Sequence, residues 1–274
     1  MIQYVYLGRV AYDDALRLQA EIAELRLQRR VDNVLLLLEH PPVLTLGRNA
    51  DRSNVLASDE LLASRGVTLH EINRGGDVTY HGPGQLVGYP IFDLRTLQNA
   101  NGGRLGPVDF VRLMEEVLIR LCGVYGVRAS RISGLTGVWC GPAGGTGGER
   151  KIGAIGIHVS RGITSHGFAF NVTTDLSYFN LINPCGITDR AVTSLEKEVA
   201  GSAALPGLEA IAHQAARQFG QVFGQQILAL GSLDALRAQA AQTPAPQTPA
   251  EDTPLQIPAE VERLHGETPR PVRA

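Results

Sequence analysis

A run of three strand-like stretches between Thr136 and Val172 constrains the fold more than any other feature of the sequence. The stretches TGVWC, KIGAIGIHVS and ITSHGFAFNV are rich in β-branched and apolar residues over lengths typical of strands. Arg161-Gly162 separates the last two stretches and predicts a tight hairpin turn. The glycine-rich residues 141–148 join the first two. Strands joined in this way form a sheet, and a sheet must bury at least one face against other elements.

Helical periodicity supplies elements that can cover such a sheet. Apolar residues recur at three- and four-residue steps in three segments, which predicts helices over 15–25 and 110–121 and a final helix from about Leu208 to Phe223. Ile2 to Leu7 predicts a first strand, and the continuous apolar run Val34 to Glu39 predicts a buried one. The expected fold class is therefore α+β, a single domain with a central mixed β-sheet flanked by helices.

The C-terminal end of the chain has a different composition. Seven of the fifteen prolines fall between Pro244 and Pro271, and few residues there are large and apolar. Such a segment cannot offset the entropy lost on ordering. We expect residues 1–235 to form the folded domain and residues 236–274 to form a Pro-rich, disordered tail.

The overall composition excludes some classes of protein. A net charge of −2 gives no basic excess for non-specific binding to nucleic acid. Three cysteines are too few, and odd in number, for a disulfide framework, which favours a reducing compartment. No secretory signal is visible at the N-terminus, and the longest apolar run, Val34 to Leu38, is far too short for a membrane span. We expect a soluble, cytoplasmic protein that binds neither nucleic acid nor membrane.

Residues 73–90, NRGGDVTYHGPGQLVGYP, form the first segment with the character of a ligand site. Gly75-Gly76 allows close approach of a ligand to the backbone, and Gly82-Pro83-Gly84 predicts a sharp loop beside His81. Bare backbone and a few convergent polar side chains are typical of small-molecule sites. On composition alone, an ordinary turn-rich connection with one surface histidine has about equal weight.

The order of residues in this segment resembles the R-G-G-x-x-T-Y-H-x-x-G-Q signature of the lipoyl(octanoyl) transferase family. The upstream segment LLLLEHPPVLTLGR and the downstream segments GLTGVWC, KIGAIGIHVSRGITSHGFAFNV and INPCGITDRAVTSL are also similar to that family. The resemblance covers roughly Leu35 to Leu195. It implies that residues 1–235 are an acyltransferase catalytic domain, similar in fold to the catalytic domain of biotin and lipoate protein ligases.

Cys185 is the best nucleophile candidate among the cysteines. Pro184 fixes a turn before it and Gly186 leaves the approach to its sulfur open, whereas Cys140 lies in a predicted strand and Cys122 on the apolar side of a predicted helix. A free thiol is only a few per cent thiolate at neutral pH, and a nearby ammonium would favour the anion.

Lys151 is the candidate for that ammonium, because it opens a strand and is the only lysine between Met1 and Cys185. From spacing alone, however, a solvated surface charge is the preferred interpretation, as for most exposed lysines. In the family, the lysine of K-I-x-x-I-G pairs with the cysteine of P-C-G, and Lys151 and Cys185 occupy those places. The resemblance thus implies a Cys185–Lys151 catalytic pair.

By the same resemblance, three segments would contact the acyl chain. The implied substrate-binding residues are Arg74, Gly75, Gly76, Asp77, Val78, Thr79, Tyr80, His81, Ala154, Ile155, Gly156, Gly167, Phe168 and Ala169.

The resemblance also implies the reaction and its partners. Cys185 would take an octanoyl group from octanoyl-acyl carrier protein as a thioester. A lysine on the lipoyl domains of 2-oxo-acid dehydrogenase complexes, or on the glycine cleavage carrier protein, would then accept it as an amide. Lys151 would act as general base for that lysine. No cofactor and no metal are implied, the sequence has no G-x-x-x-x-G-K-[ST] phosphate loop, and we expect a monomer.

Three alternatives remain open on the sequence. An ATP-dependent lipoate or biotin protein ligase would share the glycine-rich arginine segment but has no use for a cysteine in P-C-G. A cysteine hydrolase would pair the thiol with His81, His158 or His166. A non-catalytic module that recognises lipoyl-type domains would need neither Cys185 nor Lys151.

Overall fold

A mixed β-sheet organises the molecule. The computed structural model describes residues 1–99, 102–141, 148–183, 191–199 and 204–243. Within these residues nine strands form one sheet in the order β12-β1-β2-β6-β10-β9-β8-β7, with β11 paired to β9. The strands are β1 (Ile2–Arg9), β2 (Asn33–Glu39), β6 (Gln85–Ile91), β7 (Ser130–Ile132), β8 (Leu135–Cys140), β9 (Arg150–Ser160), β10 (Ile163–Asn171), β11 (Ala191–Val192) and β12 (Ile227–Ala229). The pairs β12-β1, β1-β2 and β11-β9 are parallel and the other pairs are antiparallel.

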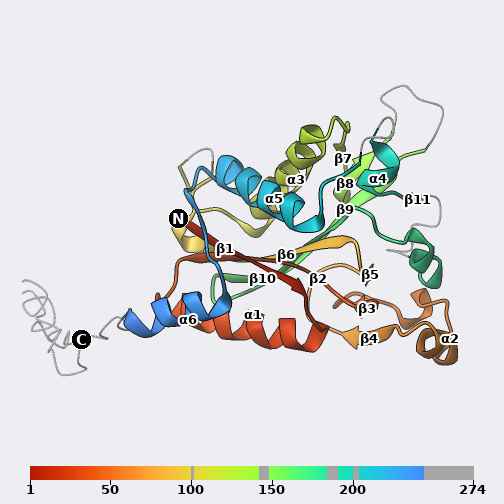
Figure 1. The fold of residues 1–274 in the computed structure, drawn as a ribbon, viewed down its shortest axis with the longest axis horizontal. Coiled ribbons are helices and arrows are strands. Elements are labelled where there is room, and N and C mark those ends of the chain that lie inside the picture. The colour runs from red at the N-terminus through yellow and green to blue at the C-terminus, as the bar shows by residue number, and fades with distance from the viewer. Residues whose placement is uncertain (100–101, 142–147, 184–190, 200–203, 244–274) are drawn as a thin grey trace, which may run out of the picture. The chain divides into compact units, whose positions relative to one another are not determined.

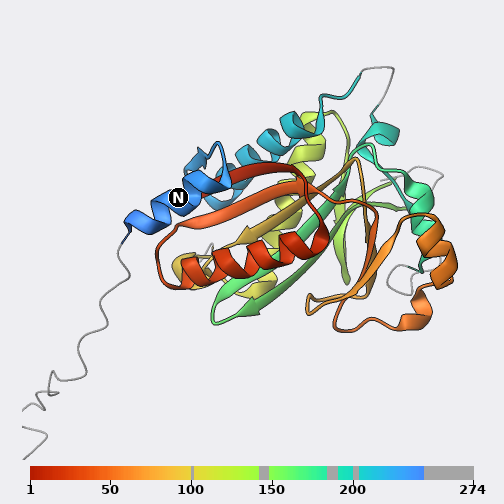
Figure 2. The same cartoon turned by 60° about the horizontal axis from the view of Figure 1, so that its bottom comes forward.

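Helices cover both faces of this sheet. Helices α3 (Pro107–Val124) and α5 (Leu208–Phe223) lie on one face, and α1 (Tyr12–Leu27) and α6 (Leu233–Gln242) lie on the other (Figure 1; Figure 2 shows the α1 side). The remaining helical elements are short. They are the helices α2 (Asp59–Ser64) and α4 (Leu195–Glu198) and the 3₁₀ turns η1 (Arg52–Asn54), η2 (Leu94–Thr96) and η3 (Leu176–Leu181). The α+β class with a mixed central sheet and flanking helices is confirmed.

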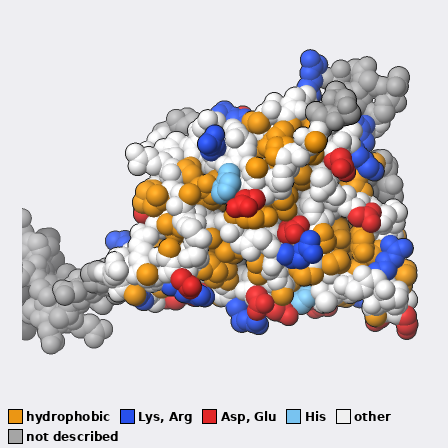
Figure 3. Space-filling view, viewed as in Figure 1, with side chains coloured by type: hydrophobic (Ala, Val, Ile, Leu, Met, Phe, Trp, Pro, Cys, Tyr) orange, Lys and Arg blue, Asp and Glu red, His pale blue; other side chains and the backbone are white. Residues whose placement is uncertain are grey.

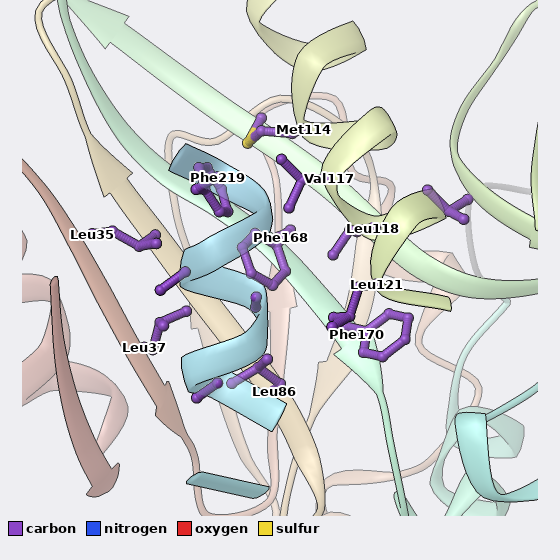
Figure 4. Packing of buried hydrophobic residues seen from close by; sticks show 14 of the residues in the cluster. Leu35, Leu37, Leu86, Met114, Val117, Leu118, Leu121, Phe168, Phe170 and Phe219 are labelled. Atoms are coloured by element: carbon purple, nitrogen blue, oxygen red, sulfur yellow. The ribbon is translucent and has the colours of Figure 1, made fainter. Parts of the chain in front are cut away.

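The apolar run in β2 is explained by these two layers. Leu35 and Leu37 point into the core beneath α3 and α5, whereas Leu36 and Leu38 point into the core beneath α1 and α6. Successive side chains of a strand alternate between faces, so a strand covered on both sides needs apolar residues at every position. Figure 4 shows the first core, where Leu35 and Leu37 of β2 lie near Phe219 of α5 and Phe168 of β10.

The hairpin between β9 and β10 matches its prediction. Both turn residues have positive φ, 50° for Arg161 and 82° for Gly162. Positive φ at both central positions gives a backbone twist that matches the right-handed twist of the strands. The hairpin therefore fixes the register in which Ala154 faces Ala169 and Gly156 faces Gly167.

A second, smaller sheet packs near one end of the main sheet. It has the order β4-β3-β5 and is formed by β3 (Val43–Leu46), β4 (Thr68–Glu71) and β5 (Val78–His81). Its apolar core includes Leu44, Leu62 and Tyr80. The segment 73–90 thus contains two strands, β5 and β6, because Val78 to His81 and Gln85 to Ile91 find partner strands far away in the sequence.

The expectation that Leu208–Phe223 is the last helix is wrong, since α6 follows it. Leu236 and Ala240 of α6 are buried against α1 and β2, Arg237 pairs with Glu21, and the carbonyl of Ala240 accepts a hydrogen bond from Arg30. The expected domain boundary at residue 235 falls inside this helix. Contacts along the chain separate Met1–Pro244 from Ala245–Ala274. The tail predicted to be disordered spans residues 236–274, and its part from residue 244 onward lies outside the described residues.

The surface shows no field of a single charge sign on the face in Figure 3. Acidic and basic side chains are interspersed there with apolar ones. In the described part of the chain, no helix is both long and apolar enough to cross a bilayer.

Helix α6 should contribute measurably to stability. A chain ending at Thr243 should have the same free energy of unfolding as the full chain. A chain ending at Ala235 should lose about 2–5 kcal/mol, because truncation removes a buried leucine and exposes the apolar surface beneath it. Urea denaturation followed by circular dichroism measures both values. Equal stability of the two truncated chains would show that the packing of α6 contributes nothing.

Candidate active site

A cavity of about 320 Å³ lies against β9 and β10 of the main sheet. Its lining comes from widely separated parts of the chain: the start of α1, the segment containing β5, β6, the start of β8, the paired strands β9 and β10, η3 and β11. All of the predicted substrate-binding residues except Tyr80 line it, and Lys151 lines it as well. The three predicted segments, separated by up to about ninety residues, therefore converge on one space.

Small residues make the floor of this cavity. Ala154 is paired with Ala169 and Gly156 with Gly167, and alternation places all four on the same face of the sheet. The large apolar residues of these strands, such as Phe168 and Ile155, pack toward the opposite face, under α3 and α5. The absence of bulk at these four positions leaves a channel that runs along β9 from Lys151 to Gly156, roughly 16 Å of strand.

The segment Arg74-Gly75 closes the channel at Gly156. The Gly75 amide donates a hydrogen bond to the Ile157 carbonyl at 2.9 Å, so this segment lies directly on β9. A Cβ atom at residue 156 would lie 2.6 Å from the Gly75 carbonyl oxygen, and the close approach therefore requires glycine there. The Arg74 guanidinium is buried and donates hydrogen bonds to the carbonyl and hydroxyl oxygens of Thr45.

Tyr80 differs from its neighbours in the predicted segment. Residues 77, 79 and 81 line the cavity, whereas Tyr80 is 1% exposed and packs on the other side of β5, against Tyr178 and Phe179. The cause is the two-residue period of a strand, which a sequence motif read as a loop does not reveal.

Lys151 lies at the other end of the channel, at the start of β9. It is paired with Trp139 of β8, and its ammonium lies 4.6 Å from the centre of the Trp139 ring. A cation over an indole face is attracted by about 0.5–2 kcal/mol. Gly137 of β8 lies beside this side chain, since a Cβ atom there would be in ordinary van der Waals contact with Lys151 Cε, at 3.5 Å. The side chain of Lys151 is thus held along β8.

Cys185 lies outside the described residues, which stop at 183 and resume at 191. Both flanking residues are anchored near the cavity. The Asn183 amide donates to the Asn54 carbonyl at 2.7 Å, and the Asn54 side chain donates to Asp77, which lines the cavity. On the other side, Val192 is paired with Lys151. The described residues on either side of Cys185 are therefore connected to residues of the cavity wall, Asn183 through Asn54 and Val192 directly.

Burial keeps the cavity histidines neutral. Burial, together with smaller contributions from neighbouring charges such as Arg74, lowers the pKa of His81 to about 3 and that of His166 to about 4. A general base works best when its pKa is near the operating pH. His158 does not line the cavity. These values weigh against the Cys–His hydrolase alternative, because neither cavity histidine would hold a proton at neutral pH.

Four polar residues of the cavity wall were not predicted. Tyr12, Gln85, Tyr89 and Asn171 line the cavity and are all less than 6% exposed. The Tyr89 hydroxyl and His40 are joined by a 2.7 Å hydrogen bond. Gln85 belongs to the recognised motif, so the sequence held a signal for it. Asn171 lies in the segment ITSHGFAFNV, which also resembles the family, but outside the residues implied to contact the acyl chain. Tyr12 precedes every segment of the resemblance, and only tertiary structure brings it here.

No group of three or more His, Cys, Asp or Glu side chains among the described residues is arranged to hold a metal ion.

The chain matches a family model over most of its folded part. Residues 11–220 match the model of the lipoyl protein ligase A/B catalytic domain. Curated relatives are similar over nearly their whole length. A protein of Acidobacterium capsulatum named octanoyltransferase is 61% identical over 85% of this chain and 94% of its own. One of Koribacter versatilis with the same name is 50% identical over 97% of each chain.

Solved structures share the fold at low sequence identity. A crystal structure of lipoate-protein ligase A bound with ATP has a TM-score of 0.63 at 15% identity, over 88% of this chain and 93% of that one. A bipartite lipoate protein ligase from Thermoplasma acidophilum also has a TM-score of 0.63, at 16% identity, over 88% of this chain and 91% of its own. From the family model, the relatives and the shared architecture, the chain belongs to the lipoyl protein ligase A/B catalytic domain family.

Proposed function

We propose that this protein transfers an octanoyl group from octanoyl-acyl carrier protein to a lysine of lipoyl domains, through a thioester on Cys185. Acyl transfer is supported by the relatives named octanoyltransferase, which match the chain at up to 61% identity. The acceptors would be the lipoyl domains of 2-oxo-acid dehydrogenase complexes and the glycine cleavage carrier protein. The unpaired thiols of Cys122 and Cys140 support a reducing compartment, and the cytoplasm is the one we propose.

The observation that carries this proposal is the pairing of β11 with β9. It places Val192, seven residues after Cys185, beside Lys151 at the open end of a channel with an apolar floor. An acyl chain bound on that floor would present its thioester carbon at the end where Lys151 lies. The narrow channel of small residues suits an unbranched chain. Each methylene group of that chain buried there contributes about 0.8 kcal/mol to binding.

The reaction balances in two steps. The Cys185 thiolate attacks the carrier thioester, the carbon–sulfur bond to the carrier breaks, and the carrier thiolate takes a proton from the Lys151 ammonium. Neutral Lys151 then takes a proton from the acceptor ammonium, and the freed amine attacks the Cys185 thioester. The carbon–sulfur bond breaks, Cys185 leaves as a thiolate, and the amide nitrogen loses its second proton to solvent. One proton is released per turnover, and the thiolate–ammonium pair is restored.

Cys185→Ser should abolish the covalent intermediate. Wild-type protein incubated with octanoyl-carrier protein without ATP should gain the mass of one octanoyl group on Cys185, and the variant should gain none. Turnover should fall by about 1,000-fold or more, since removing a nucleophile usually costs at least that much. Mass spectrometry and a lipoyl-domain acylation assay measure the two effects.

Cys122→Ser and Cys140→Ser are the matched controls. Both thiols are buried, and a hydrogen bond to Cys140 together with burial raises the pKa of Cys122 far above its usual range. These variants should lower stability and leave the adduct intact. Loss of the adduct in all three variants would remove the assignment of Cys185, and strict dependence on ATP would favour a ligase.

Lys151→Arg should separate the two steps. Arginine keeps a positive charge near the thiolate but does not readily give up its proton. Transfer to the lipoyl domain should therefore slow by about 100-fold or more, while formation of the acyl-enzyme slows less. Single-turnover assays of each step measure this difference. Normal transfer by the variant would show that Lys151 is not the base.

Ala154→Leu should shorten the preferred acyl chain. Ala154 faces Ala169 on the cavity floor, and the larger side chain would fill the space beyond the thioester. Octanoyl transfer should fall by roughly 10- to 200-fold, the range for misfit in an apolar pocket, with a smaller loss for butanoyl transfer. Competition between carrier thioesters of different length measures the preference. Val159→Leu, on the opposite face of β9 and outside the cavity lining, is the control. An unchanged length preference in Ala154→Leu would place the acyl chain elsewhere.

A further inference from the structure

A chain of buried hydrogen bonds with fixed direction connects His81 to Lys151. Gln85 donates from Nε2 to the Tyr80 carbonyl at 3.0 Å and to Asn171 Oδ1 at 2.9 Å. A carbonyl only accepts, so the contact with Tyr80 fixes which end of the Gln85 amide is nitrogen. Gln85 Oε1 is therefore the atom that meets His81 Nδ1, at 2.8 Å, and the ring nitrogen must donate.

The same reasoning fixes the other end of the chain. Asn171 donates from Nδ2 to the Thr193 carbonyl at 2.9 Å, which orients its amide and leaves Oδ1 to accept from Gln85. Thr193 in turn donates its amide to the Lys151 carbonyl at 2.9 Å. Every member of the chain except Lys151 is buried, with an exposed fraction of 7% or less.

This arrangement assigns the tautomer of His81. With the hydrogen on Nδ1, the Nε2 atom of the neutral ring carries a lone pair and no hydrogen. No hydrogen-bond partner for Nε2 is found among the described residues, and His81 lines the cavity. The ring is also held by stacking on Tyr12, with the two ring planes 11° apart. His81 is thus a rigid hydrogen-bond acceptor in the wall of the cavity.

We propose that His81 Nε2 accepts a hydrogen bond from the amine of the acceptor lysine and orients its lone pair toward the thioester carbon. This inference rests on the proposed function. The acyl chain carries no hydrogen-bond donor, and a thioester offers only its carbonyl oxygen as an acceptor. Of the two attacking atoms, the thiolate sulfur and the amine nitrogen, only the nitrogen carries hydrogen atoms that Nε2 can accept, and a buried acceptor without a donor costs free energy.

His81 can orient the amine without competing for its proton. Burial, assisted by the charge of His40, lowers the pKa of His81 to about 3, so the ring stays neutral near pH 7. The first ammonium proton passes to Lys151 and the second to solvent, as in the two-step scheme. His81 gains and loses no proton in either step. Its contribution is the direction of the nitrogen lone pair as the new carbon–nitrogen bond forms.

The test compares two nucleophiles on the same acyl-enzyme. A lipoyl domain discharges the thioester with an amine, whereas the free carrier protein discharges it with a thiolate, whose attacking sulfur carries no hydrogen. In His81→Phe, which keeps a ring for Tyr12 to stack on, the ratio of amine to thiol discharge should fall about 10-fold, the loss expected for one hydrogen bond in the transition state. His158→Phe, outside the cavity, should leave the ratio unchanged. An unchanged ratio in His81→Phe would overturn the inference.

A second measurement does not depend on a variant. Nitrogen-15 NMR of the imidazole rings distinguishes the two tautomers, and His81 should carry its hydrogen on Nδ1 between pH 5 and pH 8, about two units or more above the pKa given by burial. A hydrogen on Nε2 would overturn the inference. Failure of wild-type protein to form any acyl-enzyme would instead remove the proposed function, so the two failures are distinguishable.

Discussion

The hydrogen bond from the Thr193 amide to the Lys151 carbonyl joins two segments that are more than forty residues apart in the sequence. It continues the pairing of β11 with β9, and the next link, from Thr193 to Asn171, carries the connection into the centre of the sheet. Because Thr193 and Asn171 are buried, loss of the bond between them would leave a buried polar group unsatisfied at a cost of about 1–3 kcal/mol. The position of Lys151 relative to β10 and β5 depends on this backbone contact more than on its own long side chain.

The cavity exists because two kinds of packing meet on one pair of strands. On one face of β9 and β10, Phe168, Phe170 and Ile155 fill the core beneath α3 and α5. On the other face, alanine and glycine leave space that the second sheet covers without filling. A close-packed interior does not normally tolerate such a gap, since atoms lining a void lose dispersion contacts. The Arg74-Gly75 segment, bonded to Ile157, holds the cover in place.

Sequence patterns predicted those elements that are determined by residues close together in the chain. Periodicity gave α5 with its observed bounds, and the positive φ values of Arg161 and Gly162 follow from the turn that their residue types favour. The family motif indicated most of the cavity wall. Helix α6 was missed because its apolar positions are few and its stability comes from packing on α1. Tyr80 was placed in the site because a motif gives the order of residues but not the face of a strand. Tyr12 was missed because only the tertiary fold brings it to the cavity.

Burial also divides the chemistry among the titratable groups. It lowers the pKa of His40, His81 and His166 far below neutrality, so these three imidazoles are neutral near pH 7 and serve as hydrogen-bonding groups. Lys151 differs because it is only half-buried, at the start of β9, where its ammonium lies over the face of Trp139. If several of these groups had a pKa near neutrality, each of them could take up a proton during the reaction. In the reaction we propose, proton transfer belongs to Lys151, whereas the neutral imidazoles serve as hydrogen-bonding groups.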